Sequence, residues 1–182
     1  MTSHDPIYLT TVSAGFIQDW LDALKPRCTP VKLTSLLERS GLQASPMVPT
    51  QRVTLEEIAR LYQLAAPETG DEMMGLWSRP IRPRALQHLV TVQREASSMI
   101  SALYRFSTFW NLLLDDFRLE LRNRPEETEL ALVPYLRETQ PQRFGHMLIL
   151  KLAHGLLSWL GGGETKVKAV RFAFARPDFA AD

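Results

Sequence analysis

The spacing of apolar residues predicts helices in the first part of the chain. Between residues 7 and 24, apolar side chains recur every three or four positions, which is the period of a helix with one buried face. A second helix is predicted to begin at Thr29, with Pro30 in its first position, and to stop at Gly41. Proline fits the first position of a helix and glycine fits the left-handed residue that follows one, so these boundaries have a physical basis.

Three further helices follow from the same kind of pattern. Thr54 and Glu57 have the spacing of a capping box, so a helix is predicted from Thr54 to a turn after Pro67. Two long helices are predicted at about residues 95–111 and 142–160, and the second ends in three consecutive glycines. Each carries an apolar stripe, so we expect all three to pack against a core.

Alternation of apolar and polar residues predicts three strands in the second half of the chain. Two of them form a hairpin at about residues 115–133, where a polar turn joins them. A third strand is predicted at about residues 168–175 and is ended by Pro177. The predicted fold class is therefore α+β, with a helical N-terminal part and long helices packed against a small antiparallel sheet that contains the hairpin and the terminal strand.

Composition narrows the class of protein. The 182 residues, of which 45% are hydrophobic and 23% charged, suit one globular domain. A formal net charge of +1 gives the whole chain no attraction to nucleic acid or to a membrane surface. The N-terminus lacks the pattern of a signal peptide, and no apolar run approaches the ~20 residues of a membrane span. The single cysteine, Cys28, suits a reducing compartment, so we expect a cytoplasmic protein that does not insert into membranes.

No residue pattern indicates a catalytic, metal or cofactor site. His146 and His154 lie two turns apart on a predicted helix, ~12 Å along its axis, which is too far for one metal ion. Asp115 and Asp116 are adjacent and would point to opposite faces of a strand. The sequence contains no nucleophile elbow, zinc-protease helix or phosphate-binding loop. We therefore predict no catalytic residue, no metal and no cofactor, and expect a domain that binds or senses a partner.

One stretch of the chain is rich in arginine. Residues 79–124 contain eight arginines, no lysine and four acidic residues, which gives a local net charge of +4. Because guanidinium groups bind carboxylates and phosphates in a bidentate manner, one hypothesis is that Arg79, Arg94 or Arg118 holds an anionic or zwitterionic effector. The alternative is that these arginines form ion pairs on a solvated surface with the acidic residues that flank the stretch.

Aromatic residues supply the other candidates for a binding site. Trp77, Tyr104 and Trp110 lie near a pair of prolines and on the predicted helix at residues 95–111. There they would either line a cavity or pack in the core, since ligand pockets are mostly apolar with a few polar groups. The candidate ligand-binding residues are therefore Trp77, Arg79, His88, Arg94, Tyr104, Trp110 and Arg118.

Several short motifs occur in a definite order along the chain. They are Thr69-Gly70-Asp71 with Gly75-Leu76, Ser97-Ser98-Met99, Arg105-Phe106, the hairpin, the helix that ends in glycines, and Val170-Arg171-Phe172 before Pro177. In this order they resemble the N-terminal effector domain of a subfamily of bacterial AraC-type transcription regulators, often labelled the arabinose-binding type. The resemblance covers nearly the whole chain, although the family's usual glycines are missing from the stretch at residues 85–92.

The resemblance implies a regulatory role. It implies a domain that binds a small metabolite, can form a homodimer, and acts on DNA only through a helix-turn-helix domain that would follow residue 182 in the parent protein. It implies no specificity for sugars. Two other functions stay open: a protein-interaction or dimerisation module without a small ligand, and a small enzyme whose titratable groups are brought together only by the fold.

Overall fold

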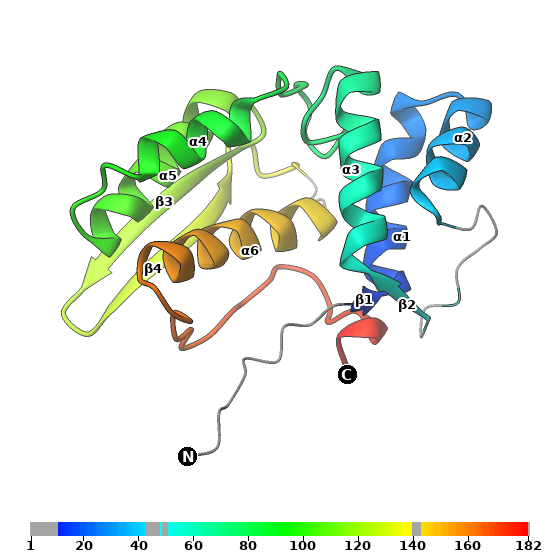
Figure 1. Cartoon of the computed structure of the whole chain (residues 1–182). Helices are drawn as coiled ribbons and strands as arrows, with labels where there is room; N and C mark the ends of the chain where they lie inside the picture. Colours follow the sequence, from blue (N-terminus) through cyan, green and yellow to red (C-terminus); the bar gives the residue numbers. More distant parts are fainter. Residues whose placement is uncertain (1–10, 43–47, 49–50, 140–142, 182) are drawn as a thin grey trace, which may run out of the picture.

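The structure, a computed structural model, describes residues 11–42, 48, 51–139 and 143–181. Its secondary structure is α+β, which confirms the predicted fold class. Helices of the N-terminal part gather on one side of the molecule, a β-hairpin with two helices lies on the other, and one long helix runs between them (Figure 1).

The N-terminal part is built from four helical segments and two short strands. The strands pair with each other in an antiparallel ribbon, with Val12 opposite Val53. In chain order the elements are β1 (Thr11–Ser13), α1 (Ala14–Leu24), the 3-10 helix η1 (Lys25–Arg27), α2 (Pro30–Ser40), β2 (Arg52–Thr54) and α3 (Leu55–Thr69).

Side-chain caps fix two of these helices at the predicted residues. Thr29 Oγ1 accepts a hydrogen bond from the backbone of Lys32, and α2 ends at Gly41, whose φ of 88° is left-handed. At α3, Thr54 Oγ1 accepts from the Glu57 amide at 3.2 Å, while Glu57 Oε2 accepts from the Thr54 amide at 2.8 Å. The predicted capping box is therefore confirmed, and such a cap contributes ~1 kcal/mol to helix stability.

Two predicted boundaries in this part need correction. The helix predicted over residues 7–24 begins only at Ala14, because residues 11–13 pair with β2 and Ser13 caps the helix. Residues 7–10 lie outside the described part of the chain. Helix α3 also continues beyond Pro67 to Thr69, where a turn was predicted, and its C-cap is Gly70 with a φ of 68°.

The loop that follows α3 is organised by one buried carboxylate. Asp71 is 3% exposed, and its two oxygens accept backbone hydrogen bonds from Met73 at 3.0 Å, Gly75 at 2.7 Å and Ile81 at 2.9 Å. The carboxylate thus satisfies amides that would otherwise be buried without partners. This loop leads into helix α4 (Ala85–Gln93), which the sequence pattern did not predict.

Helix α5 (Met99–Leu113) and a hairpin form the next layer. Ser98 caps α5, so the helix predicted at about residues 95–111 is present but displaced by a few residues. The hairpin consists of β3 (Phe117–Arg124) and β4 (Glu127–Pro134) and confirms the predicted pair of strands. The outer edge of β3 is protected at Leu119, whose backbone N–H and C=O both bond to the side-chain amide of Asn111 on α5.

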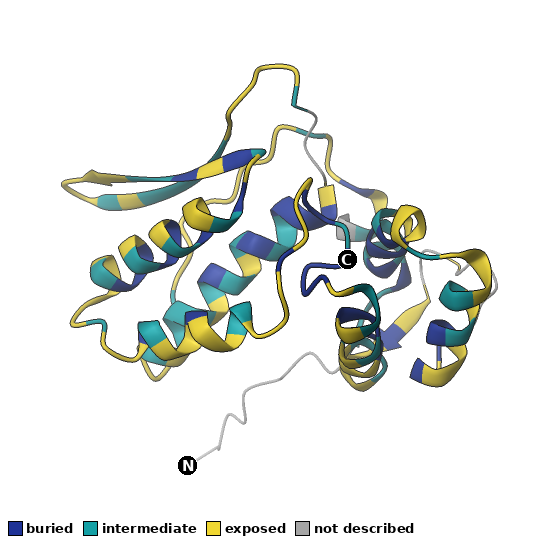
Figure 2. Ribbon diagram, turned by 90° about the horizontal axis from the view of Figure 1, so that it is seen from above, coloured by how far each residue is buried: buried dark blue, intermediate teal, exposed yellow. Residues whose placement is uncertain are grey.

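Helix α6 (Arg143–Leu160) packs against both halves of the molecule. Phe144 stacks on Trp20 of α1 with ring centroids 5.6 Å apart, and Arg143 Nε donates to Asp19 Oδ2 at 2.6 Å. Further along the helix, Ile149 is fully buried and belongs to the same hydrophobic cluster as the cores of α1, α3 and α5. The buried faces of these helices turn inward, while the hairpin tip is exposed (Figure 2).

The terminal strand predicted at about residues 168–175 is wrong. Those residues belong to no β-ladder and bend at Lys168, Ala173 and Phe174, and Val170 and Phe172 are 57% and 38% exposed. The alternation is real, yet a strand also needs a partner edge at hydrogen-bonding distance. The described chain then ends in the 3-10 helix η2 (Asp178–Ala181), which packs against α1 through Phe179 and Phe16, with ring centroids 6.1 Å apart.

Candidate functional site

A groove of about 1250 Å³ lies between β4, α6 and the extended segment at residues 165–173. It is somewhat larger than the ~300–1000 Å³ of typical small-molecule pockets. Its three walls are successive segments of the chain, and Leu103 of α5 and Phe117 of β3 complete the lining.

The wall formed by α6 is one face of that helix. Its groove-lining residues, among them Met147, Leu150, Lys151 and His154, recur with helical spacing. At the inner end of this wall His146 is 9% exposed, and its ring meets the edge of Phe117 with centroids 4.5 Å apart. The helix therefore contributes a mainly apolar surface with a lysine and two histidines on it.

The wall formed by β4 includes consecutive residues from Glu127 to Leu132. Successive side chains of a strand point to opposite faces, so this run indicates that the edge of β4 borders the groove as well as one face. In the described chain β4 pairs only with β3, and its other edge has no strand beside it.

We call residues 164–177 the strap, because they close the third side of the groove and are fastened at separate points. Near its start, the Thr165 amide donates to Ser158 Oγ at 3.0 Å and the Thr165 carbonyl lies 2.8 Å from His154 Nε2. Further along, Lys168 Nζ donates to Glu127 Oε2 at 2.9 Å. Beyond Lys168, the ring of Phe174 lies near that of His146 on α6, with centroids 6.5 Å apart, and the strap forms no backbone ladder.

The charges around the groove do not balance. Among the acidic residues of β4, Glu127 is paired with Lys168 and Arg124, and Glu129 with arginines of β3. The hydrogen bond from Lys168 holds the pKa of Glu127 below its usual value, and the nearby positive charge of Lys168 acts in the same direction.

Three cations that line the groove are differently placed. Lys151, Lys166 and Arg171 form no hydrogen bond and no ion pair within 4.0 Å among the described residues, and the same holds for Arg137 and Glu126 of the lining. The hydroxyl of Thr165, also in the lining, is buried and has no hydrogen-bond partner among those residues. The groove thus offers an excess of positive charge to a ligand.

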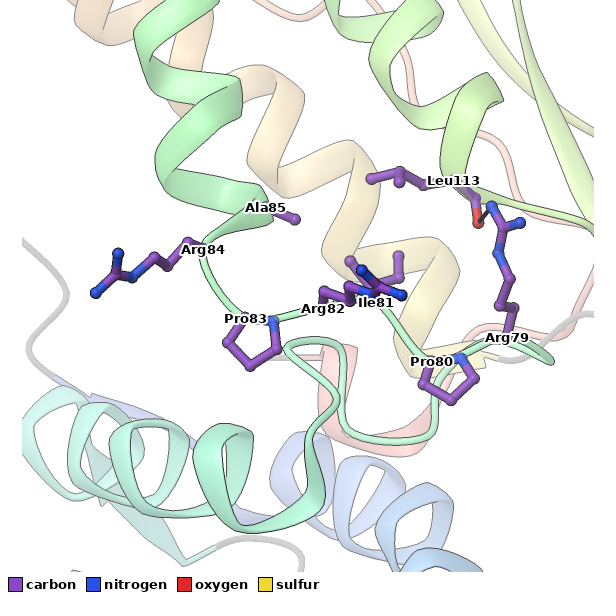
Figure 3. A pocket seen from close by; sticks show the side chains of 8 residues that line it. All are labelled: Arg79, Pro80, Ile81, Arg82, Pro83, Arg84, Ala85 and Leu113. Carbon is purple, nitrogen blue, oxygen red and sulfur yellow. Dashed lines mark hydrogen bonds between the residues drawn. The ribbon is translucent and has the colours of Figure 1, made fainter.

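A smaller pocket of about 430 Å³ lies along residues 79–85 and Leu113. Figure 3 shows that Arg79 turns toward Leu113 and that Arg84 points away from the other side chains. Arg79 donates to the carbonyls of Leu112 and Leu113, both at 2.9 Å, and pairs with Asp115 at 3.5 Å. Its guanidinium therefore satisfies the C-terminal carbonyls of α5, an observed structural role.

The structure separates the seven candidate residues predicted from the sequence. Trp77 and Trp110 are 3% and 0% exposed and belong to the hydrophobic core, whereas Tyr104 is 65% exposed on the surface of α5. His88 and Arg94 are exposed at α4.

The remaining candidate, Arg118, pairs with Glu120 at 2.8 Å and lies 5.9 Å from the ring of Tyr135. Of the seven, only Arg79 lines the smaller pocket, and none lines the groove. Their role in ligand binding stays a prediction that their positions do not support.

Sequence reasoning missed the residues of the groove. The signal that could have found its cations is a second basic stretch, since residues 150–176 carry five basic residues and one acidic residue. Lys166 lies just before the stretch predicted as a strand and Lys168 lies at its start, so their charges were not considered as part of a binding surface. No local pattern shows that this stretch faces α6.

The described residues also bear on two other kinds of site. They contain no group of three or more His, Cys, Asp or Glu residues that could hold a metal ion. None of the helices among them is both long and apolar enough to cross a membrane.

Comparison with known proteins identifies the family. Residues 31–182 match the family model described as the arabinose-binding domain of AraC transcription regulators, N-terminal. No curated protein and no solved structure matches the chain. The family match covers well over half of the sequence and agrees with the order of motifs from Thr69 to Pro177. The chain therefore belongs to the family of N-terminal arabinose-binding-type domains of AraC transcription regulators, whose role is regulatory.

Proposed function

We propose that this chain is the effector-sensing part of an AraC-type regulator and that a small molecule binds in the groove between β4, α6 and the strap. The observation that carries the proposal is the groove itself, which combines a large volume with an apolar lining and unpaired cations. In the proposed protein, which would act in the bacterial cytoplasm, a DNA-binding domain follows the chain and supplies the contact with DNA.

The strap gives this proposal a mechanism. A ligand that contacts α6 and the strap together would favour one position of the strap over others, because it binds that position more tightly. The strap leads directly into η2, so a change in the position of the strap would also move the C-terminal end of the described chain. Effector binding would thereby alter the placement or pairing of DNA-binding domains, with a coupling of typically ~1–3 kcal/mol.

Thermal unfolding with a panel of metabolites tests the proposal. A ligand present at 100 times its dissociation constant stabilises the folded chain by ~2.7 kcal/mol, which raises the Tm by roughly 5–10 °C for a chain of this size. We expect a saturable rise with one chemical class of compound. A Tm that no compound in a broad panel changes would contradict the proposal.

A matched pair of variants locates the binding site. Thr128 and Val133 both lie on β4 with side chains on opposite faces of the hairpin, and only Thr128 lines the groove. We expect Thr128→Trp to fill part of the groove and to weaken the binding of the stabilising ligand at least tenfold, while Val133→Trp leaves its affinity within about twofold. Equal effects of both substitutions would place the ligand elsewhere.

One observation favours the alternative of a dimerisation module. Ile100 and Tyr104 lie one turn apart on α5 and are 50% and 65% exposed, and Trp159 near the end of α6 is 53% exposed. Sedimentation of the wild type and of Tyr104→Lys would reveal this function. A dimer that Tyr104→Lys dissociates, without any ligand response in the wild type, would favour assembly over sensing.

A further inference from the structure

The apolar side of the groove includes residues that are unusually exposed for their type. Val167, Val170 and Phe172 of the strap all line the groove and are 51%, 57% and 38% exposed. They face a helix wall that presents Leu150 and Leu157. Apolar surface of this extent gains free energy when a nonpolar group covers it, so the groove suits an apolar chain more than a compact polar molecule.

The charged residues of the groove indicate which charge the other end of such a ligand carries. Lys151 stands on α6, and Lys166 and Arg171 stand on the strap, so unpaired cations flank the groove from two walls. The acidic residues on the third wall offset them only in part, because Glu127 and Glu129 are already bound to Lys168 and to arginines of the hairpin, which leaves Glu126. A ligand with an anionic group would offset part of this positive charge.

We propose that the effector of this site is an amphipathic monocarboxylate: a molecule with a carboxylate at one end and an extended apolar chain. The carboxylate meets Lys151, Lys166 and Arg171, and the chain lies along Val170 and Phe172. This inference rests on the proposed function, since it names the class of molecule that the same groove binds.

A series of simple probes tests the class. Octanoate, decanoate and dodecanoate, each below its micelle concentration, are titrated into the 182-residue chain by calorimetry, beside decanol and decylamine. We expect affinity to rise about fourfold for each methylene added (~0.8 kcal/mol). Decanoate should bind more tightly than decanol and much more tightly than decylamine. Raising the salt concentration should weaken the binding of decanoate and leave the binding of decanol nearly unchanged.

Substitutions divide the two halves of the proposed contact. The triple variant Lys151→Gln, Lys166→Gln, Arg171→Gln should weaken decanoate about tenfold, the combined effect of three partly exposed ion pairs, and leave decanol unchanged. Val170→Ser with Phe172→Ser should weaken both probes. Arg94→Gln removes an exposed cation outside the groove and serves as the matched control, with no effect on either probe.

The outcomes separate this inference from the proposed function. If decanol binds as tightly as decanoate and the triple variant changes nothing, the anionic class is wrong while a sensing groove stands. If no acyl probe binds but another metabolite raises the Tm, the class is again wrong and the function stands. If nothing binds and sedimentation shows self-association that Val170→Asp with Phe172→Asp abolishes, the groove holds a second copy of the chain and both proposals fail.

Discussion

At the scale of single residues, Gly75 shows how tightly the loop after α3 is packed. Its φ is +83°, and a β-carbon there would lie 2.8 Å from the carbonyl oxygen of Ala23 and 2.7 Å from the side chain of Arg27. Gly70 also has a positive φ, of +68°, but nothing lies within 4 Å of its β-carbon position. The two glycines therefore share a backbone requirement and differ in their surroundings.

We expect Gly75→Ala to lower the free energy of unfolding by ~3 kcal/mol or more, since it adds a clash with backbone to the left-handed strain. Gly70→Ala should cost only the strain, ~1 kcal/mol. Chemical denaturation of both variants checks the difference. Equal losses of stability would show that Ala23 and Arg27 move to make room for the added methyl group without a cost in free energy.

Gln93 is a second residue whose environment makes a definite prediction. It is 0% exposed at the end of α4, and neither atom of its side-chain amide has a hydrogen-bond partner among the described residues. A buried polar group without a partner costs ~1–3 kcal/mol. We expect Gln93→Met, which keeps the volume and removes the polar atoms, to raise the stability by ~1 kcal/mol in thermal unfolding. A loss instead would mean that the amide bonds to an internal water molecule.

At the scale of elements, the start of α3 couples stability to pH. The hydrogen bonds from Thr54 hold the pKa of Glu57 below its usual value, because they favour the carboxylate. A depressed pKa contributes stability that is present above the usual pKa of a glutamate, ~4.3, and is lost as the pH falls through the lower folded value. The capping box is therefore weakened by acid.

The expected result is that Glu57→Ala lowers the Tm at pH 7 and that this difference shrinks toward zero at pH 3. The same comparison with Glu56→Ala is the control, since Glu56 lies in the same first turn outside the capping box. Thr54→Ala should cost ~1 kcal/mol at pH 7. A Glu57→Ala penalty that is the same at both pH values would contradict the charged form of the cap.

The elements also show what could be predicted from sequence and what could not. The starts of α2 and α3 depend on Thr29 and Thr54, whose side chains bond within their own first turn, so local spacing was sufficient. Helix α5 begins behind its Ser98 cap, a few residues later than predicted. The start of α4 has no such signal. The Leu86 amide instead donates to Glu72 Oε2 at 2.9 Å, across a loop with two prolines.

The position of the strap and the residues of the groove could not be predicted from the sequence, for the same reason. Alternation at residues 168–175 describes extended backbone, but pairing depends on an edge that only the tertiary fold supplies. The candidate arginines were chosen from the densest basic stretch, whereas the groove collects cations from α6 and the strap. Family membership could be inferred from the order of the motifs, because several short motifs in a fixed order are more specific together than any one of them alone.

At the scale of the whole molecule, the strap connects the groove with the N-terminal part. Beyond the strap, the ring of Phe179 lies 6.1 Å from that of Phe16 on α1, and the guanidinium of Arg143 lies 5.9 Å from the Phe179 ring. The fit against α1 is close, since a β-carbon on Gly15 would lie 2.7 Å from Phe179 Cδ1. The contacts of Phe179 thus hold the end of the strap against α1 in the N-terminal part.

Two substitutions weaken the contact between Phe179 and α1, one on each side of it. Phe179→Ala removes the ring, and Gly15→Ala pushes it away while giving α1 a residue with higher helix propensity. We expect trypsin to cut at Lys166, Lys168 or Arg171 about tenfold faster in both variants, because cleavage follows the population of the released strap. Gly15→Ala should show this with little loss in Tm, which distinguishes release of the strap from general unfolding. If neither variant is cut faster than the wild type, the strap is held by its contacts with α6 and β4 alone, and Phe179 does not link the groove to α1.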